Sequence, residues 1–216
     1  MSQSILNNVA ALQATRQLSI TSSGMKATIE RLTTGKRINH ASDDATGLAT
    51  ANTYNAQAKT ATELRKLANN DYYAAAANDG YLDEATNLVQ RLIELAAGGN
   101  TSAAEFSSTA TLASAAAQKA GMSALSITSG ATASTALTSI ATQRGTIAAS
   151  MATAQSNANL YGIEAENKTA QYSNIMDADI GSEVVNLTKW QILSQAGTSA
   201  LTNANTASQY VLGLLR

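Results

Sequence analysis

The chain has 216 residues, no cysteine, no proline and one histidine, and 14 basic against 15 acidic side chains leave a net charge of −1. Without cysteine there is no disulfide framework, thiol nucleophile or thiolate metal site, and one histidine excludes a multi-histidine zinc centre. No basic field is present to hold nucleic acid or an acidic membrane. The chain contains 44 alanines, which favour helix but bury little area. We therefore expect thin apolar stripes and a stability that depends on neighbouring chains.

No apolar run approaches the roughly 18 residues that a membrane-spanning helix needs. The N-terminal residues also lack the basic and then apolar pattern of a general secretory leader. We therefore expect neither a transmembrane segment nor a cleaved leader, although export through a dedicated apparatus requires no such leader.

The first 34 residues carry apolar side chains at steps of three and four, the spacing of one helix face. They are Ile5, Val9, Leu12, Met25, Ile29 and Leu32. The Ser22-Ser23-Gly24 sequence is expected to interrupt this helix, and Gly35 is expected to end it.

A second helix is predicted to start near Ser42, a good N-cap, with Asp43 and Asp44 in its first turn at the positive end of the helix dipole. Its stripe runs from Leu64 to Ala96 in steps of three or four. One helix over 43–97 is about 80 Å long at about 1.5 Å per residue. Gly98-Gly99-Asn100 is a clear stop signal.

Three further helices are predicted, over 101–125, 136–175 and 180–214, with a turn at 126–135 hinged at Gly130 and a break at 177–179. No alternation typical of a strand persists along the chain. The expected fold is all-α: a long antiparallel helical rod in which the N- and C-terminal helices pair as a coiled coil and the three central helices pair with one another.

Candidate catalytic groups have simpler structural explanations. Asp43 and Asp44 are adjacent on a helix and do not face one another, so they are interpreted as helix-capping residues. His40 lies in a polar connector, Trp190 is interpreted as an interface residue, and the tyrosines of the long helix as packing residues. No nucleophile, base and orienting group can be assembled, so we predict a non-enzyme without cofactor or metal.

Three segments carry a resemblance to a known family. Residues 29–52 read IERLTTGKRINHASDDATGLATAN, which resembles the bacterial flagellin signature IERLSSGxRINSAxDDAAGxAIAN. The end of the chain resembles the flagellin ending QILxQAGTSxLxQAN, closing on VLxLLR. Residues 80–96 (GYLDEATNLVQRLIELA) are similar to GALNEINNxLQRVRELA.

The resemblance implies a secreted, extracellular subunit that polymerises into the flagellar filament for swimming. It implies an inner terminal-helix domain (D0-like) of 1–36 with 180–216, and a rod domain (D1-like) of 37–179. It also implies type III export, a flagellar export chaperone at the C-terminal segment, and contacts with the filament cap and hook–filament junction proteins. Only 126–135 is available between the central helices, so we expect no outer variable domain and at most a vestigial β-hairpin.

Three sets of residues are assigned roles on this basis. The filament-core assembly residues are Val9, Leu12, Leu193, Ala196, Ala200, Leu201, Ala204, Val211, Leu212 and Leu215. The residues that fix register between domains or subunits are Arg31, Lys36, Arg37, Asn39, Asp43 and Asp44. The segment that the vertebrate innate flagellin receptor reads in many flagellins matches at Arg91, Glu94 and Leu95, while Ile93 replaces an arginine.

Two alternatives remain at this point. A hook–filament junction protein shares terminal helices with flagellin, although the QAGTS and VLxLLR ending favours flagellin. A specialised surface-exposed flagellin that binds glycans is compatible with the tyrosines.

Overall fold

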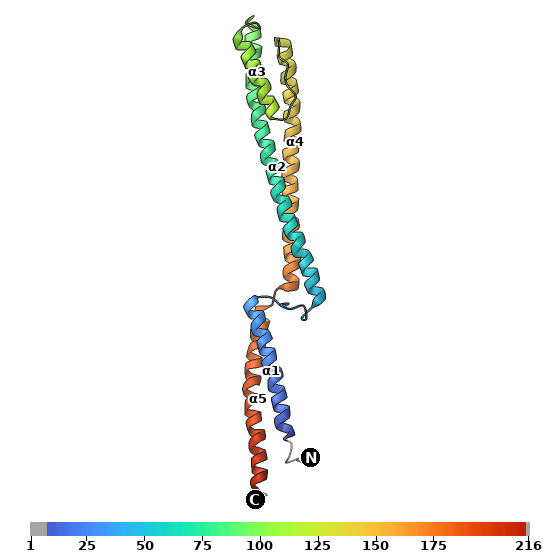
Figure 1. Ribbon diagram of the computed structural model, residues 1–216, viewed down its shortest axis with the longest axis vertical. Coiled ribbons are helices and arrows are strands. Elements are labelled where there is room, and N and C mark those ends of the chain that lie inside the picture. Colours follow the sequence, from blue (N-terminus) through green and yellow to red (C-terminus); the bar gives the residue numbers. More distant parts are fainter. Residues whose placement is uncertain (1–7, 215–216) are drawn as a thin grey trace. The chain divides into compact units, whose positions relative to one another are not determined.

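The computed structural model describes residues 8–214, without the side chains of 208 and 211–214, and contains five helices (Figure 1). They are α1 (Val9–Thr34), α2 (Ala45–Ala97), α3 (Ala104–Lys119), α4 (Gly130–Met176) and α5 (Ile180–Leu214). Within the described part of the chain the only extended pairing is an isolated antiparallel bridge between Lys36 and Asp177. The all-α prediction is therefore confirmed.

The chain forms two compact units, and the two longest helices contribute to both. One unit holds the described residues of Met1–Asn55 and Thr169–Arg216, and the other holds Ala56–Lys168. The division into domains expected from the sequence, with borders at 36/37 and 179/180 and no outer domain, stays a prediction.

Helix α1 is continuous through Ser22-Ser23-Gly24, so the predicted interruption is wrong. The side chain of Asn8 caps its first turn by accepting from the Ala11 N–H at 3.0 Å. Gly35 ends the helix in the left-handed conformation, with φ 69° and its N–H donating to the Arg31 carbonyl. Gly24 is there for close packing rather than for a turn, because a Cβ at this position would lie 2.8 Å from the ring of Trp190.

Helix α2 begins at Ala45, and its cap is Asp44 rather than the predicted Ser42. The Asp44 carboxylate accepts from the Gly47 N–H at 2.8 Å. A Cβ at Gly47 would collide with that carboxylate, so the glycine leaves room for the cap. At the other end Gly99 has φ 78°, which confirms the predicted stop.

Helices α3 and α4 have different bounds from those expected. Gly121 has φ 84° and follows the end of α3 at Lys119, so α3 stops short of the predicted 125. Helix α4 already starts at Gly130, because Ser129 and Thr132 cap it reciprocally: the Ser129 hydroxyl accepts from the Thr132 N–H, and the Thr132 hydroxyl accepts from the Ser129 N–H. Gly130 is therefore the first helical residue and not a hinge.

The unit of Ala56–Lys168 has a core drawn from α2, α3 and α4. Its fully buried side chains include Leu82, Val89, Leu92, Ala113, Ala117 and Ile140. Ile127, from the segment between α3 and α4, also packs on this core. At the surface, Arg144 of α4 joins Asp79 and Asp83 of α2, with Nε 2.9 Å from one carboxylate and Nη1 3.0 Å from the other.

Candidate functional site

Helices α1 and α5 pair antiparallel along their length, as predicted (Figure 1). Four contacts mark the register, and each step along α1 is matched by a similar step back along α5. The Asn8 amide donates to the Ala204 carbonyl at 3.0 Å, and Leu18 lies against Gly197. Gly24 lies against Trp190, and Arg31 Nε is 3.1 Å from Glu183 Oε1.

The seam between α1 and α5 consists mainly of small and hydroxylated residues, with Leu18, Met25 and Trp190 as its larger members. Thr21 and Thr28 are fully buried, and their hydroxyls have no hydrogen-bond partner. Seam positions on α1 follow the alternating steps of three and four of a coiled coil, through Ala11, Ala14, Leu18, Thr21, Met25 and Thr28. Such a seam buries little apolar area, so the pair alone gains little stability.

Large apolar side chains remain exposed on the outer faces of this pair. Val9 and Leu12 are 56% and 64% exposed, and on α5 Val185 and Ile192 are 68% and 63% exposed. Val185 and Ile192 are seven residues apart and share one face of α5. The sequence interpretation missed both residues as assembly positions, although their spacing of one heptad was visible.

The predicted assembly residues divide into two groups. Leu193, Leu201 and Ala204 are half-buried within the single chain, whereas Ala196 and Ala200 are exposed, like Val9 and Leu12. Leu215 and the side chains of Val211 and Leu212 lie outside the described residues.

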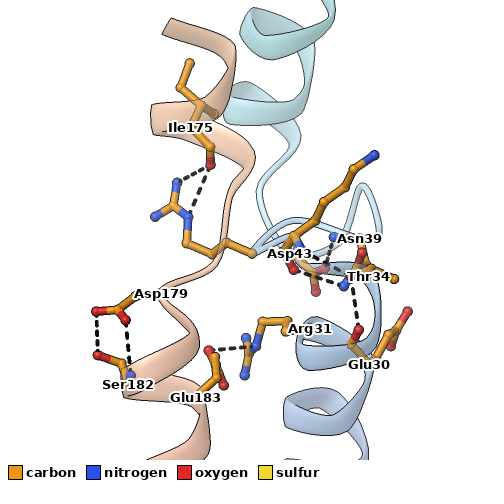
Figure 2. Close-up of polar contacts among 11 residues, drawn as sticks. Glu30, Arg31, Thr34, Asn39, Asp43, Ile175, Asp179, Ser182 and Glu183 are labelled. Carbon is orange, nitrogen blue, oxygen red and sulfur yellow. Dashed lines mark hydrogen bonds and ion pairs between the residues drawn. The ribbon is translucent and has the colours of Figure 1, made fainter. Parts of the chain in front are cut away.

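The connector between α1 and α2 (residues 35–44) and the connector between α4 and α5 (residues 177–179) are joined by backbone hydrogen bonds. The Arg37 N–H donates to the Met176 carbonyl at 2.6 Å, and the Ala178 N–H donates to the Gly35 carbonyl at 2.9 Å. The Arg37 guanidinium donates twice to the Ile175 carbonyl, from Nε at 3.3 Å and Nη2 at 3.0 Å (Figure 2). Arg37 thus satisfies a carbonyl that the end of α4 leaves free.

Arg31 and Glu183 face one another across the top of the α1·α5 pair (Figure 2). Their 3.1 Å contact is an ion pair without a hydrogen bond, because the Arg31 Nε–H is not aligned with Glu183 Oε1. The other carboxylate oxygen, Oε2, has no hydrogen-bond partner either. Nearby, His40 Nε2 lies 2.8 Å from Glu30 Oε1. The histidine that the sequence left without a role therefore fastens the connector to α1.

Two carboxylates order the connectors by accepting backbone N–H groups. Asp43 accepts from His40 at 2.9 Å and Asn39 at 3.0 Å, and these bonds hold the pKa of its carboxyl below the ordinary value. Asp179 caps α5, and bonds from the Ser182 hydroxyl and then from the Ser182 and Gly181 N–H groups lower its pKa. The interpretation of Asp44 and Asp179 as capping residues agrees with this geometry. The same interpretation of Asp43 is wrong, because Asp43 accepts from N–H groups that precede it in the connector and not from the first turn of α2.

The predicted register residues therefore lie together, and most of their polar groups are used within the chain. Arg31, Arg37, Asp43 and Asp44 make the contacts above, and the Asn39 amide donates to the Lys36 carbonyl at 3.2 Å. The exposed Lys36 contributes its backbone to the bridge with Asp177. Residues 31–44 and 175–183 therefore form one contact region, called the joint below, which is held by helix caps and by hydrogen bonds to backbone carbonyls.

The predicted receptor segment lies on α2. The Arg91 guanidinium bonds to Glu94 at 3.2 Å and to Glu105 of α3 at 3.0 Å. Leu95 is only 8% exposed and belongs to the core.

No described helix combines the length and the apolarity needed to cross a membrane. Within the same residues, no three histidine, aspartate or glutamate side chains gather to hold a metal ion.

Comparison with known proteins decides the family. Residues 5–118 match the bacterial flagellin N-terminal helical region, and residues 131–215 match the bacterial flagellin C-terminal helical region. This chain belongs to the bacterial flagellin family. Flagellins are structural, non-enzymatic subunits that self-assemble into the extracellular flagellar filament, and the resemblance stated from the sequence is confirmed.

Individual relatives agree with this assignment. The flagellar filament 30.7 kDa core protein of Treponema maltophilum is 29% identical, over 98% of this chain and 99% of its own length. Polar flagellin A of Vibrio parahaemolyticus is 37% identical over 49% of this chain and 29% of its own. The B-type flagellin of Pseudomonas aeruginosa is 35% identical over 49% of this chain and 22% of its own. This flagellin thus matches one relative from end to end and less than a third of each of the other two.

Proposed function

We propose that the α1·α5 pair is the part of this flagellin that packs in the filament core. The observation that carries the proposal is the exposed apolar face of α5, with Val185 and Ile192 one heptad apart. Between residues 184 and 210 the only charged side chain is Lys189. Covering this face with another copy therefore buries apolar area and removes little charge from water.

An open filament needs interfaces between different surfaces of identical subunits, so that growth never closes into a ring. The pair supplies two different surfaces. Val9 and Leu12 are exposed on α1, and Val185 and Ile192 are exposed on α5. Because the seam is thin and its buried threonine hydroxyls have no hydrogen-bond partner, the isolated α1·α5 pair is only marginally stable. Contacts with neighbouring subunits then offset the conformational entropy that the pair loses when it becomes ordered.

The assembly residues assigned from the sequence are retained in this proposal with different duties. Val9, Leu12, Ala196 and Ala200 are placed at contacts between subunits, because they are exposed in the single chain. Leu193, Leu201 and Ala204 are assigned to the half-buried flanks of the pair. For Val211, Leu212 and Leu215, the assembly role is proposed from the family resemblance alone.

The joint is proposed to fix the register between the terminal helices and the connectors at 35–44 and 177–179. The support is the concentration of contacts at 31–44 and 175–183, including Arg37 with the Ile175 carbonyl and Arg31 with Glu183. The proposed domains are 1–36 with 180–216, and 37–179, with no outer variable domain. Repeated along a filament, a small change at this joint would alter the helical shape.

The further partners are proposed from the family alone: an export chaperone at the C-terminal segment, the filament cap and the hook–filament junction proteins.

The innate flagellin receptor is proposed to contact Arg91 and Glu94, with Leu95 supporting the helix from the core. Since Arg91 already bonds to Glu105, receptor binding has to compete with that ion pair. Glu105→Gln should therefore strengthen binding measured with the purified receptor ectodomain, and weaker binding would contradict this.

The test of the core proposal is the critical concentration for seeded polymerisation. Val185→Ser with Ile192→Ser removes two apolar side chains whose full burial contributes about 1.5–3 kcal/mol each. Together they contribute about 3–6 kcal/mol, and because each 1.4 kcal/mol is tenfold, we expect the critical concentration to rise roughly a hundredfold or more. The matched control is Leu67→Ser with Leu160→Ser, two exposed residues of the other unit. An unchanged critical concentration in the α5 variant, or an equal rise in the control, contradicts the proposal.

A further inference from the structure

We infer that Trp190 and Gly24 form a register lock that selects one alignment of α1 against α5. Trp190 is the only tryptophan of the chain and lies on the α5 side of the seam. A Cβ added at Gly24 would lie 2.8 Å from two carbons of its indole ring. Only a residue without a side chain therefore leaves room for the ring at this level.

The space that Gly24 leaves for the Trp190 ring is called the notch below. It explains why a glycine, which is otherwise unfavourable, stands in the middle of α1. Glycine in the middle of a helix costs about 0.5–1 kcal/mol relative to alanine, and α1 is continuous on both sides of Gly24. Gly24 has no positive φ, so no turn requires it. What requires it is the close approach of the Trp190 ring.

The surroundings of Gly24 have the pattern of a coiled-coil hole. In such packing one side chain inserts among four residues at i, i+3, i+4 and i+7 of the facing helix. Around Gly24 these positions are Thr21, Gly24, Met25 and Thr28, and both threonines are fully buried. Lys189 Nζ lies 5.6 Å from the centroid of the indole ring, a cation–π contact.

The rest of the seam offers little contrast in shape between one alignment and the next. Four of its α1 positions, Ala11, Ala14, Thr21 and Thr28, are small, and the two larger ones, Leu18 and Met25, are seven residues apart, so a slip of one heptad puts one in the place of the other. A slip of one heptad brings Gln17 or Arg31 opposite Trp190 in place of Gly24. Gly24 is the only glycine of α1, so no slipped alignment offers a second notch. The lock thus compensates for a seam that would otherwise tolerate sliding.

The test uses disulfide trapping in the polymerised full-length chain, which has no cysteine of its own. Leu18→Cys with Gly197→Cys reports the observed register, because Leu18 Cδ1 lies 3.4 Å from the position of a Cβ at Gly197. Leu18→Cys with Ala204→Cys reports a slip of one heptad. Disulfides within one chain are separated from those between chains by mobility on a non-reducing gel.

With Trp190 present, we expect the in-register disulfide to dominate. Trp190→Ala creates no clash and only removes the ring, so the off-register disulfide should rise about tenfold, which corresponds to 1.4 kcal/mol of lost discrimination. Trp190→Phe, which keeps an aromatic ring, should preserve the in-register product. The control is Tyr73→Ala, an aromatic residue of α2 that is 69% exposed and should change neither disulfide.

Gly24→Ala tests the notch in a chain without added cysteines. The methyl group expels the Trp190 ring, so tryptophan emission should move to longer wavelength in the filament. Unchanged emission in this variant, or an off-register disulfide in Trp190→Ala no higher than in the Tyr73→Ala control, overturns the lock. The inference rests on the proposed core role only because the trapping is carried out in the polymer. If the native chain fails to polymerise, that result counts against the core role. If Trp190→Ala forms normal polymers with an unaltered ratio of the two disulfides, that result counts against the lock.

Discussion

At the scale of single residues, the ends of the long helices are held by a few polar side chains. Asp44 is the clearest case, because its carboxylate accepts the Gly47 N–H at 2.8 Å in the first turn of α2. Replacing an N-cap aspartate by alanine costs about 1 kcal/mol. For a chain of this size, each kcal/mol lowers the melting temperature by roughly 2–4 °C.

Asp44→Ala is therefore expected to melt about 2–4 °C below the native chain when circular dichroism at 222 nm is followed on heating. Asp44→Asn is the matched control, because asparagine caps as well as aspartate and should keep most of the stability. Equal melting temperatures for the alanine variant and the native chain would show that the cap contributes nothing.

Asp43 and Asp179 make the connectors sensitive to acid. Backbone N–H groups lower the pKa of Asp43, and the Ser182 hydroxyl and nearby N–H groups lower that of Asp179, both from an ordinary 3.8. A lowered folded-state pKa stabilises the fold above the ordinary pKa, and the stabilisation is lost as the pH falls below it. We expect amide exchange at Asn39, His40 and Gly181 to accelerate, relative to the intrinsic rate, as the pH falls below about 4.

Asp179→Asn provides the control for this acid effect, since the amide cannot titrate. In that variant the Gly181 amide should lose its dependence on acid, while Asn39 and His40 keep theirs. A native chain whose connector amides exchange with the same protection at pH 3 and pH 6 would rule out the assigned roles.

The sequence predicted the kind of residue at the helix ends better than its position. The carboxylates at 44 and 179 were correctly interpreted as caps, because local spacing determines which N–H groups they reach. Asp43 was wrongly interpreted as a cap, because it accepts from Asn39 and His40 in the connector. The cap of α2 was placed on Ser42, although Asp44 is the residue that reaches Gly47. The pairing of His40 with Glu30 was missed, because it depends on how the connector folds back along α1.

At the scale of the elements, the stability of α2, α3 and α4 depends on the core of the Ala56–Lys168 unit. Leu82 of α2 is fully buried within it, whereas Leu67 of the same helix is 56% exposed. Truncating a buried leucine to alanine costs about 2–5 kcal/mol because of the lost transfer energy and the cavity.

Leu82→Ala should therefore unfold at clearly lower denaturant concentration, while Leu67→Ala should stay within about 0.5 kcal/mol of the native chain. Urea titration followed by circular dichroism measures both variants under identical conditions. Similar midpoints for the two variants would contradict the burial that separates them.

The helices themselves were predicted from periodicity, with errors at the ends. Steps of three and four identified all five, and the glycines at 35 and 98–99 marked two ends correctly. The start of α4 was missed because the reciprocal Ser129–Thr132 cap lies in a run of Ser, Thr and Ala without apolar contrast. The Ser22-Ser23-Gly24 sequence misled because a glycine selected for packing has the same local signal as one selected for a turn.

At the scale of the whole molecule, the sequence predicted that the terminal helices pair, but not which faces remain outside. Ile192 lies in the QIL motif of the resemblance, yet only the structure shows that it is 63% exposed, whereas the adjacent Leu193 is half-buried. Distinguishing the seam from the outer face requires the register of α1 against α5. That register depends on contacts between residues far apart in the chain, such as Gly24 with Trp190.

In the proposed filament, the outer face of α5 packs against other copies in the core. Electron cryomicroscopy can test this packing on filaments grown by seeded polymerisation from the intact chain, beside a chain lacking Gln209–Arg216. We expect long uniform tubes from the intact chain and none from the truncation. In the tubes, α1 and α5 should lie in the innermost layer, with Val185 and Ile192 covered by a neighbouring subunit. Tubes in which these two side chains face solvent, or tubes from the truncated chain, would contradict the proposed packing.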